Sequence, residues 1–138
     1  MANSNGSKES HIRLAAEGAK RFVETYYPAL NSDRTALASF YHPAASIVWN
    51  GNPIASGEAF AAFFASMPDS HYDVQSYDAQ PMQFDVKGSC SFVLIVSGSV
   101  KYGELKEQRG FSETFVLKPV EVQPTRYLIS TQGFRLVV

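Results

Sequence analysis

A single cysteine, Cys90, is all that this chain of 138 residues contains, so no disulfide can form within it and a disulfide-framed secreted domain is excluded. No apolar run approaches the ~18 residues of a membrane-spanning helix, and the polar start from Met1 to Ser10 predicts no secretory signal. Charge is balanced, with 12 Lys and Arg against 13 Asp and Glu and a formal net charge of −1. This balance argues against a self-sufficient nucleic-acid binder, and we expect a soluble intracellular domain with no membrane contact.

The composition is that of one globular domain. Hydrophobic residues make up 45% of the chain and charged residues 18%, and a chain of this length buries roughly two thirds of its unfolded surface. Residues 1–9 are small and polar, which predicts a disordered leader. We therefore expect a single domain over residues 10–138.

The first half of the chain is typical of helices. From Ser10 onward, apolar residues recur at helical spacing opposite charged ones, which predicts an amphipathic helix ending at Pro28. The polar stretch that ends at Asp33 is expected to cap the N-terminus of a short second helix. Ser56 is the expected cap of a third helix, whose apolar stripe is Phe60, Phe63, Phe64 and Met67.

Strands are expected on both sides of the third helix, and they fill the chain after Pro68. A strand at Ala45 to Trp49 is expected to turn at Asn50-Gly51-Asn52 into a short return strand at residues 53–55. Four long segments follow Pro68, at Tyr72–Met82, Ser89–Tyr102, Gly110–Pro119 and Thr125–Val138. Because the helices come first and an antiparallel meander follows, the sequence predicts an α+β fold.

The segment from Ser91 to Val96 is apolar on both faces of its predicted strand. Alternation points Phe92, Leu94 and Val96 to one side, and Val93 and Ile95 to the other. A sheet covered on one side by helices should instead alternate apolar and polar residues. Either the sheet curls around its own core, or another chain covers its second face.

Residues for catalysis or metal binding are sparse. His11, His42 and His71 fall in unrelated elements, which makes a metal site improbable, and Cys90 is expected to be a buried thiol. An acid–base site inside a cone of helices and sheet would draw on Tyr26, Asp73, Asp78 or Glu113. Glu113 shares the strand parity of its apolar neighbours, so it is the carboxylate most able to point inward.

Two basic features remain. Lys101, Lys106 and Arg109 cluster between two strands and are candidate RNA contacts, although interleaved glutamates are more typical of a solvated loop. Arg135 stands in an otherwise apolar closing strand, where a guanidinium must reach water or find a carboxylate. It is either an edge arginine in solvent or half of a charged pair with a partner subunit.

Several motifs in order resemble one family. They are Phe22-Val23-Glu24-Thr25-Tyr26-Tyr27, Val48-Trp49-Asn50-Gly51-Asn52, Gly98-Ser99-Val100-Lys101-Tyr102, Gln108-Arg109-Gly110-Phe111 and Gly133-Phe134-Arg135. Over about residues 10–138 the chain resembles the nuclear transport factor 2-related export proteins, small subunits of the heterodimeric mRNA export receptor. The resemblance implies a nuclear transport factor 2-like cone, with three helices packed on a strongly bent antiparallel sheet. It also implies no enzymatic activity and no cofactor.

The resemblance implies a set of partners. The sheet would pack against the similar domain of the large receptor subunit, and the pair would bind nucleoporin phenylalanine-glycine repeats jointly and mRNA indirectly or weakly. The implied location is the nucleus and nuclear pore, with shuttling to the cytoplasm. By position, Arg135 matches an interface arginine that pairs with an aspartate of the large subunit. The other implied interface residues are Asp78, Gln80, Val93, Ile95, Ser112, Thr114 and Val116.

Two other functions stay open. One is that of nuclear transport factor 2 itself, a homodimer that imports Ran in its GDP form and that the chain also resembles around Asp33-Arg34-Thr35 and Trp49. That protein carries acidic residues where this chain has Asn50 and Tyr102-Gly103-Glu104, and losing this charge should weaken a contact to Ran's basic surface. The second alternative is a small cone-fold enzyme of the dehydratase or isomerase type.

Overall fold

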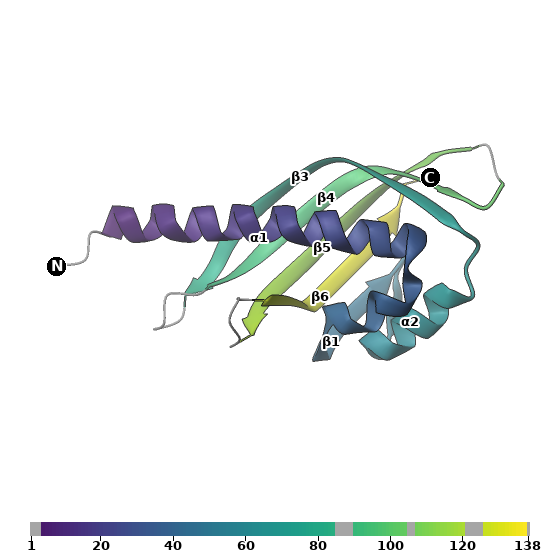
Figure 1. The fold of residues 1–138 in the computed structure, drawn as a ribbon, viewed down its shortest axis with the longest axis horizontal. Coiled ribbons are helices and arrows are strands. Elements are labelled where there is room, and N and C mark those ends of the chain that lie inside the picture. The colour runs from purple at the N-terminus through teal and green to yellow at the C-terminus, as the bar shows by residue number, and fades with distance from the viewer. Residues whose placement is uncertain (1–3, 85–89, 105–106, 121–125, 138) are drawn as a thin grey trace.

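The computed structural model describes residues 4–84, 90–104, 107–120 and 126–137. Figure 1 shows the helices first and the long strands after, as the predicted α+β class requires. The elements in order are α1 (Ser4–Ser32), the 3-10 helix η1 (Arg34–Phe40), β1 (Tyr41–Trp49), β2 (Asn52–Ile54), α2 (Gly57–Ala65), β3 (Ser70–Phe84), β4 (Cys90–Tyr102), β5 (Arg109–Val120) and β6 (Arg126–Leu136).

Helix α1 is longer at both ends than its sequence predicts. It begins at Ser4, so residues 4–9 of the expected leader are helical, and it passes through Pro28 to Ser32. Pro28 cannot donate a hydrogen bond to the carbonyl of Glu24, but both residues are exposed, so water can hydrate that carbonyl. Ala29 and Leu30 are buried directly after the proline. Their burial stabilises the last turn, and the predicted end at Pro28 is therefore wrong.

Arg34 joins the ends of the helices. The short helix expected after Asp33 is the 3-10 helix η1, and Arg34 is its first residue. The Arg34 guanidinium donates hydrogen bonds to the carbonyl oxygens of Phe64 at 2.8 Å and Met67 at 2.6 Å, at the end of α2, and its Nε donates to Leu30 of α1 at 3.2 Å. At the other end of α2, the Ser56 hydroxyl accepts a 3.0 Å hydrogen bond from the Ala59 amide, which confirms the predicted cap.

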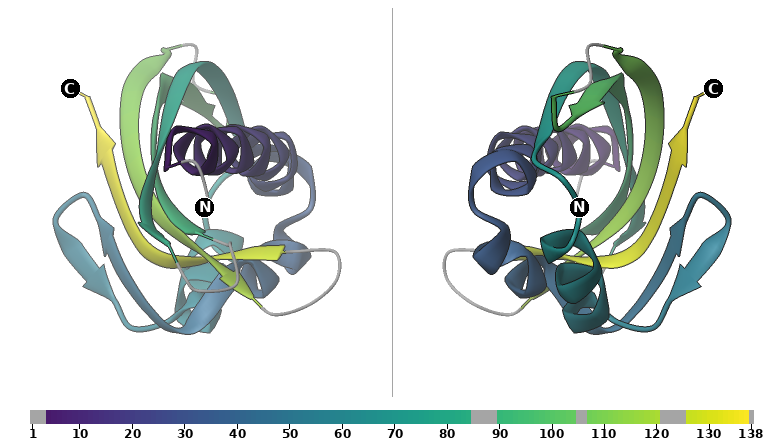
Figure 2. Two further views of the ribbon diagram at one scale, coloured as in Figure 1. Left: turned by 90° about the vertical axis from the view of Figure 1, so that its left-hand side faces the viewer. Right: turned by 90° about the vertical axis from the view of Figure 1, so that its right-hand side faces the viewer.

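The six strands form one sheet in the order β2-β1-β6-β5-β4-β3. Neighbouring strands are antiparallel except β1 and β6, which run parallel. The sheet is therefore mixed rather than wholly antiparallel, because α2 and four strands separate β1 from β6 in the chain and let β6 return in the same direction. Figure 2 shows the sheet curving around α1, with no helix over its other side.

The inner face of the sheet holds the core. Phe92, Leu94 and Val96 of β4 are fully buried against the helices, whereas Ile95 between them is 50% exposed. This alternation confirms the predicted split of the apolar strand between two faces. At the far end of the same layer, the ring of Trp49 stacks on Phe134 with centroids 3.8 Å apart.

Candidate functional site

The outer face of the sheet, turned away from α1, carries every residue predicted to contact a partner. Side chains alternate along a strand and paired residues share a face, so the strand register fixes these positions together. The rows across β3, β4 and β5 are Asp78–Ile95–Thr114 and Gln80–Val93–Val116, and Ser112 of β5 pairs with Arg135 of β6. We call these residues the outer sheet face.

Strand β1 widens this face beyond the predicted set. Gly133 of β6 pairs with both Thr114 and Val48, so the row of Ile95 continues onto β1. Val48 is 41% exposed. Val48 and Gly133 are not among the predicted interface residues, because their place on this face depends on the parallel pairing of β1 with β6. The available signal was Ile47-Val48-Trp49, which is apolar on both faces like the middle of β4.

Arg135 is exposed and stands two positions from Gly133 on the same face. It forms no ion pair with any residue that the structure describes. A Cβ added at Gly133 would meet no atom within 4 Å. The neighbour of Arg135 across the strands is Ser112, which pairs in turn with Ser97, so the exposed guanidinium is free to meet a carboxylate carried by another surface.

Inside the cone, Glu113 is the centre of a buried polar cluster. It is 1% exposed, and its carboxylate accepts 2.7 Å hydrogen bonds from the Tyr27 hydroxyl and the Gln132 amide. Gln132 also donates to the Tyr26 hydroxyl at 2.9 Å and accepts from Tyr41 at 2.6 Å. Burial raises the pKa of Glu113 to about 7, against the lowering effect of its two hydrogen bonds. The predicted inward orientation of Glu113 is confirmed.

The polar atoms at the centre of this cluster have their partners within the protein. Every oxygen and nitrogen of the Glu113 and Gln132 side chains has a partner inside the protein. The surrounding aromatic side chains are buried at 5% exposure or less: Phe22, Phe60, Phe64, Phe92 and Phe115. Of the other acid–base candidates, Tyr26 belongs to the cluster, whereas Asp73 and Asp78 are exposed on β3. The arrangement is a satisfied polar core.

Two of the three predicted basic residues lie on neighbouring strands, since Val100, next to Lys101, pairs with Arg109. Lys101 is half-buried on β4 opposite His71, and Arg109 lies 3.7 Å from the carboxylate of Glu107. Lys106 lies outside the described residues. A partly neutralised Arg109 matches the expected solvated loop better than an RNA groove.

The described part of the chain holds no group of three or more His, Cys, Asp or Glu residues that could bind a metal ion. His11 and Cys90 are buried, and the Nδ1 atom of His42 accepts a hydrogen bond from the Ala44 amide. None of the described helices is both long and apolar enough to cross a bilayer.

Comparison with known proteins finds relatives over most of the chain. The nuclear transport factor 2 (NTF2) domain matches residues 18–136. NTF2-related export protein 1 from Bos taurus is 33% identical over 110 residues, which are 79% of this chain and 78% of that protein. Nuclear transport factor 2 from Oryza sativa subsp. japonica is 33% identical over 104 residues, which are 73% of this chain and 81% of that protein.

Solved structures share the fold. A chain of the structure described as a Sac3N peptide bound to Mex67:Mtr2 superposes with a TM-score of 0.74 and 24% identity. The superposition covers 88% of this chain and 98% of that one. Transport and export proteins are thus the relatives, and a two-protein complex is among the structures of this shape.

Proposed function

The chain belongs to the nuclear transport factor 2 domain family, and from this premise we propose that it is the non-catalytic small subunit of an mRNA export receptor. In this proposal the outer sheet face packs against the nuclear transport factor 2-like domain of the large subunit. Of the two relatives, the one with the wider overlap is named an export protein, and neither name is that of an enzyme.

The observation that carries the proposal is the composition of the outer sheet face. Ile95 and Val48 expose apolar side chains on central strands, where a helix-covered sheet would turn polar residues to water. A bent sheet curling over its own core was the alternative explanation, but the core lies on the inner face and leaves this side uncovered. A partner chain would bury this apolar surface.

Arg135 sets the register in this proposal. Its exposed guanidinium would donate charge-assisted hydrogen bonds to a carboxylate of the large subunit, with Asp78 and Gln80 adding polar contacts at the other end of the face. Ser112, Thr114, Val93 and Val116 would fill the centre. An obligate interface of this kind buries apolar area that a monomer would otherwise expose.

The wider role follows from the pair. The heterodimer would cross the nuclear pore by binding phenylalanine-glycine repeats jointly, carry mRNA with at most weak help from Lys101, Lys106 and Arg109, and shuttle between nucleus and cytoplasm. Because Arg109 is paired with Glu107, we expect this chain to contribute little to RNA binding.

Import of Ran by a homodimer is the second candidate, favoured by the match to nuclear transport factor 2. It needs acidic side chains after Trp49. Here Asn50 takes that place, and its Oδ1 accepts a 2.7 Å hydrogen bond from the Leu136 amide, which ties the side chain to β6. An amide held in this way offers no negative charge to a basic partner.

The test is co-expression with the nuclear transport factor 2-like domain of a large export receptor subunit, followed by light scattering. The proposal expects a 1:1 complex whose affinity falls roughly 30-fold or more in Arg135→Asp, since that change sets like charges against each other. Arg13→Asp, at an exposed arginine of α1, is the matched control and should bind normally. A stable homodimer that ignores the domain would instead support Ran import.

A further inference from the structure

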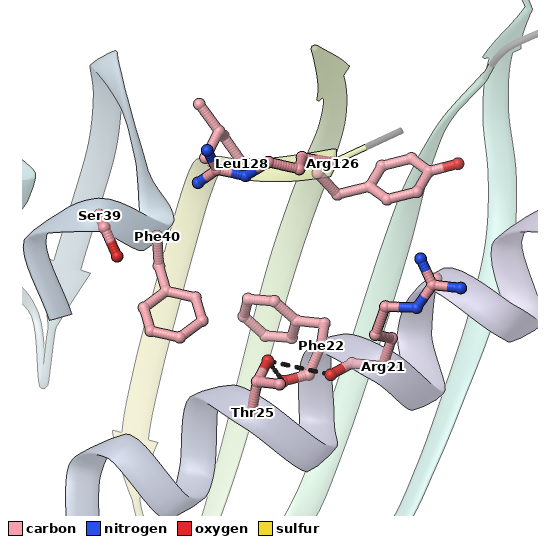
Figure 3. A pocket seen from close by; sticks show the side chains of 9 residues that line it. Arg21, Phe22, Thr25, Ser39, Phe40, Arg126 and Leu128 are labelled. Carbon is pink, nitrogen blue, oxygen red and sulfur yellow. Dashed lines mark hydrogen bonds between the residues drawn. The ribbon is translucent and has the colours of Figure 1, made fainter. Parts of the chain in front are cut away.

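A pocket of about 280 Å³ opens on the helix side of the molecule, between α1, the end of η1 and the start of β6 (Figure 3). Phe22 and Arg21 come from α1, Phe40 from η1, and Arg126 and Leu128 from β6. Its aromatic residues Phe22 and Phe40 pack against Tyr26 of the Glu113 cluster, but neither Glu113 nor Gln132 lines the pocket. It has room for one bulky side chain and is smaller than most sites for drug-sized ligands.

The interior of the pocket is apolar. Phe22 and Phe40 meet edge to face with ring centroids 6.1 Å apart, and the start of β6, residues 126–128, lies across the pocket from them. The hydroxyl of Thr25 donates within its own helix, to the carbonyl of Arg21 at 2.9 Å. The hydroxyl of Ser39 likewise donates to the Ala36 carbonyl at 2.6 Å. The polar groups of the lining are thus turned to their own backbone.

The rim of the pocket is positively charged. Arg21 and Arg126 stand on opposite sides of it, on α1 and β6, and both side chains are exposed (Figure 3). Among the described residues neither guanidinium has a hydrogen-bond or ion-pair partner, and no carboxylate lines the pocket. Glu17, one turn before Arg21, acts on Tyr127 through its charge but lies beyond ion-pairing distance of either arginine. The chain as a whole has a net charge of −1, so this local excess is specific to the pocket.

From this geometry we infer that the pocket binds an acidic peptide segment of a partner protein, which inserts one bulky apolar side chain between the rings of Phe22 and Phe40 and the start of β6. Carboxylates on either side of that residue pair with Arg21 and Arg126. The apolar anchor supplies the burial, and the charges fix the orientation of the peptide and speed its association.

A single-stranded nucleic acid fits the same pocket less well. Base recognition uses the open face of an aromatic ring. The face of Phe22 is stacked on Tyr26 with centroids 5.0 Å apart, and Phe22 is only 5% exposed. Phe40 packs edge to face against both Phe22 and Tyr26. The pocket therefore presents ring edges and aliphatic carbon, which suit an inserted side chain better than a stacked base.

The inference does not depend on the proposed function. The pocket is on the helix side of the sheet, so it stays open whether the outer sheet face binds a large subunit, a second copy or nothing. Arg135→Asp should leave the pocket unchanged, and a change at Arg21 or Arg126 should leave assembly through the sheet unchanged. An experiment that contradicts peptide binding at the pocket would therefore leave assembly through the outer sheet face untouched, and the reverse also holds.

The test is fluorescence anisotropy on the full chain, with a labelled peptide in which acidic residues flank one leucine. Arg21→Glu and Arg126→Glu are each expected to weaken binding roughly three- to tenfold, the range for reversal of an exposed charge pair. Arg13→Glu, on the same helix but outside the pocket, is the matched control and should bind as the parent chain does. Amide chemical shifts of the isotope-labelled chain should move at Gly18, Thr25 and Leu128, which line the pocket.

Specific outcomes would overturn the inference. A peptide with alanine in place of leucine must bind more weakly, and a peptide with lysine flanks must not bind. Equal binding of either peptide, unchanged affinity in both arginine variants, or shifts confined to the outer sheet face would each exclude this site. Displacement of the peptide by oligouridylate at the same residues, with oligouridylate the tighter ligand, would assign the pocket to nucleic acid instead.

Discussion

The hydroxyl of Tyr27 on α1 donates a 2.7 Å hydrogen bond to the carboxylate of Glu113 on β5, 86 positions later in the sequence. This bond crosses the layer between helix and sheet. It satisfies the carboxylate without neutralising it, and no cationic side chain contributes to the raised pKa of Glu113. The protonation of Glu113 is therefore linked to the stability of the fold.

Stability should fall as pH rises through neutrality. Burial raises the pKa of Glu113 from 4.5 to about 7, so the folded state holds this proton more tightly than the unfolded state does. The stabilisation is fully present below the unfolded pKa and is lost as pH rises through the folded pKa, with a limit of roughly 3 kcal/mol from a shift of this size. Urea denaturation between about pH 5 and pH 8 measures it.

Glu113→Gln should flatten that dependence, because the amide does not titrate. Glu24→Gln, at an exposed glutamate of α1, is the matched control and should keep the parent pH profile. A parent and a Glu113→Gln variant with parallel profiles over this range would show that another group is responsible.

Bulk at Gly133 should block assembly without harming the fold. A Cβ at this position meets nothing within 4 Å in the isolated chain, so Gly133→Gln should change the free energy of unfolding by less than about 1 kcal/mol. The same side chain would stand in the centre of the outer sheet face and weaken binding of the large-subunit domain at least tenfold. Calorimetry measures the affinity, and the affinity of Gly133→Ala should lie between those of the parent chain and Gly133→Gln. Full affinity in Gly133→Gln would place the interface elsewhere.

Neighbouring residues of β4 should respond in opposite ways. Leu94 is fully buried, so Leu94→Ala should lower the free energy of unfolding by about 2–5 kcal/mol. Ile95 is 50% exposed, so Ile95→Lys should be nearly neutral for folding, raise the solubility of the isolated chain and abolish partner binding. Thermal unfolding and light scattering on both variants separate the two roles. Loss of fold in Ile95→Lys would contradict this assignment of faces.

Pro28 should be a site where stability can be gained. Pro28→Ala restores the missing hydrogen bond to the carbonyl of Glu24 and suits the helical backbone there, so the free energy of unfolding should rise by about 1 kcal/mol or more. Thermal unfolding, followed by the fluorescence of the single Trp49, measures the change. A loss of stability would mean that the bend at Pro28 is needed to seat Ala29 and Leu30.

Local pattern was sufficient for much of this fold, since a period of two is enough to separate Leu94 from Ile95 and to turn Glu113 inward. It was also sufficient for the cap at Ser56, because a hydroxyl needs only the first turn of the helix. It could not reveal that α1 continues past Pro28, since the burial of Leu30 depends on residues far along the chain. The addition of Val48 to the outer sheet face depends in the same way on the pairing of β1 with β6.

The position of β6 has a consequence for how the protein is made. β6 follows the other strands in the sequence, yet it lies between β1 and β5 in the sheet. A chain emerging from the ribosome can pair β3, β4 and β5, but β1 and β2 have no place to dock until β6 is also available. During that interval β5 and β1 expose unpaired edges, and the risk of misassembly is greatest. Synthesis beside a partner, or a chaperone that holds the nascent sheet, would shorten this exposure.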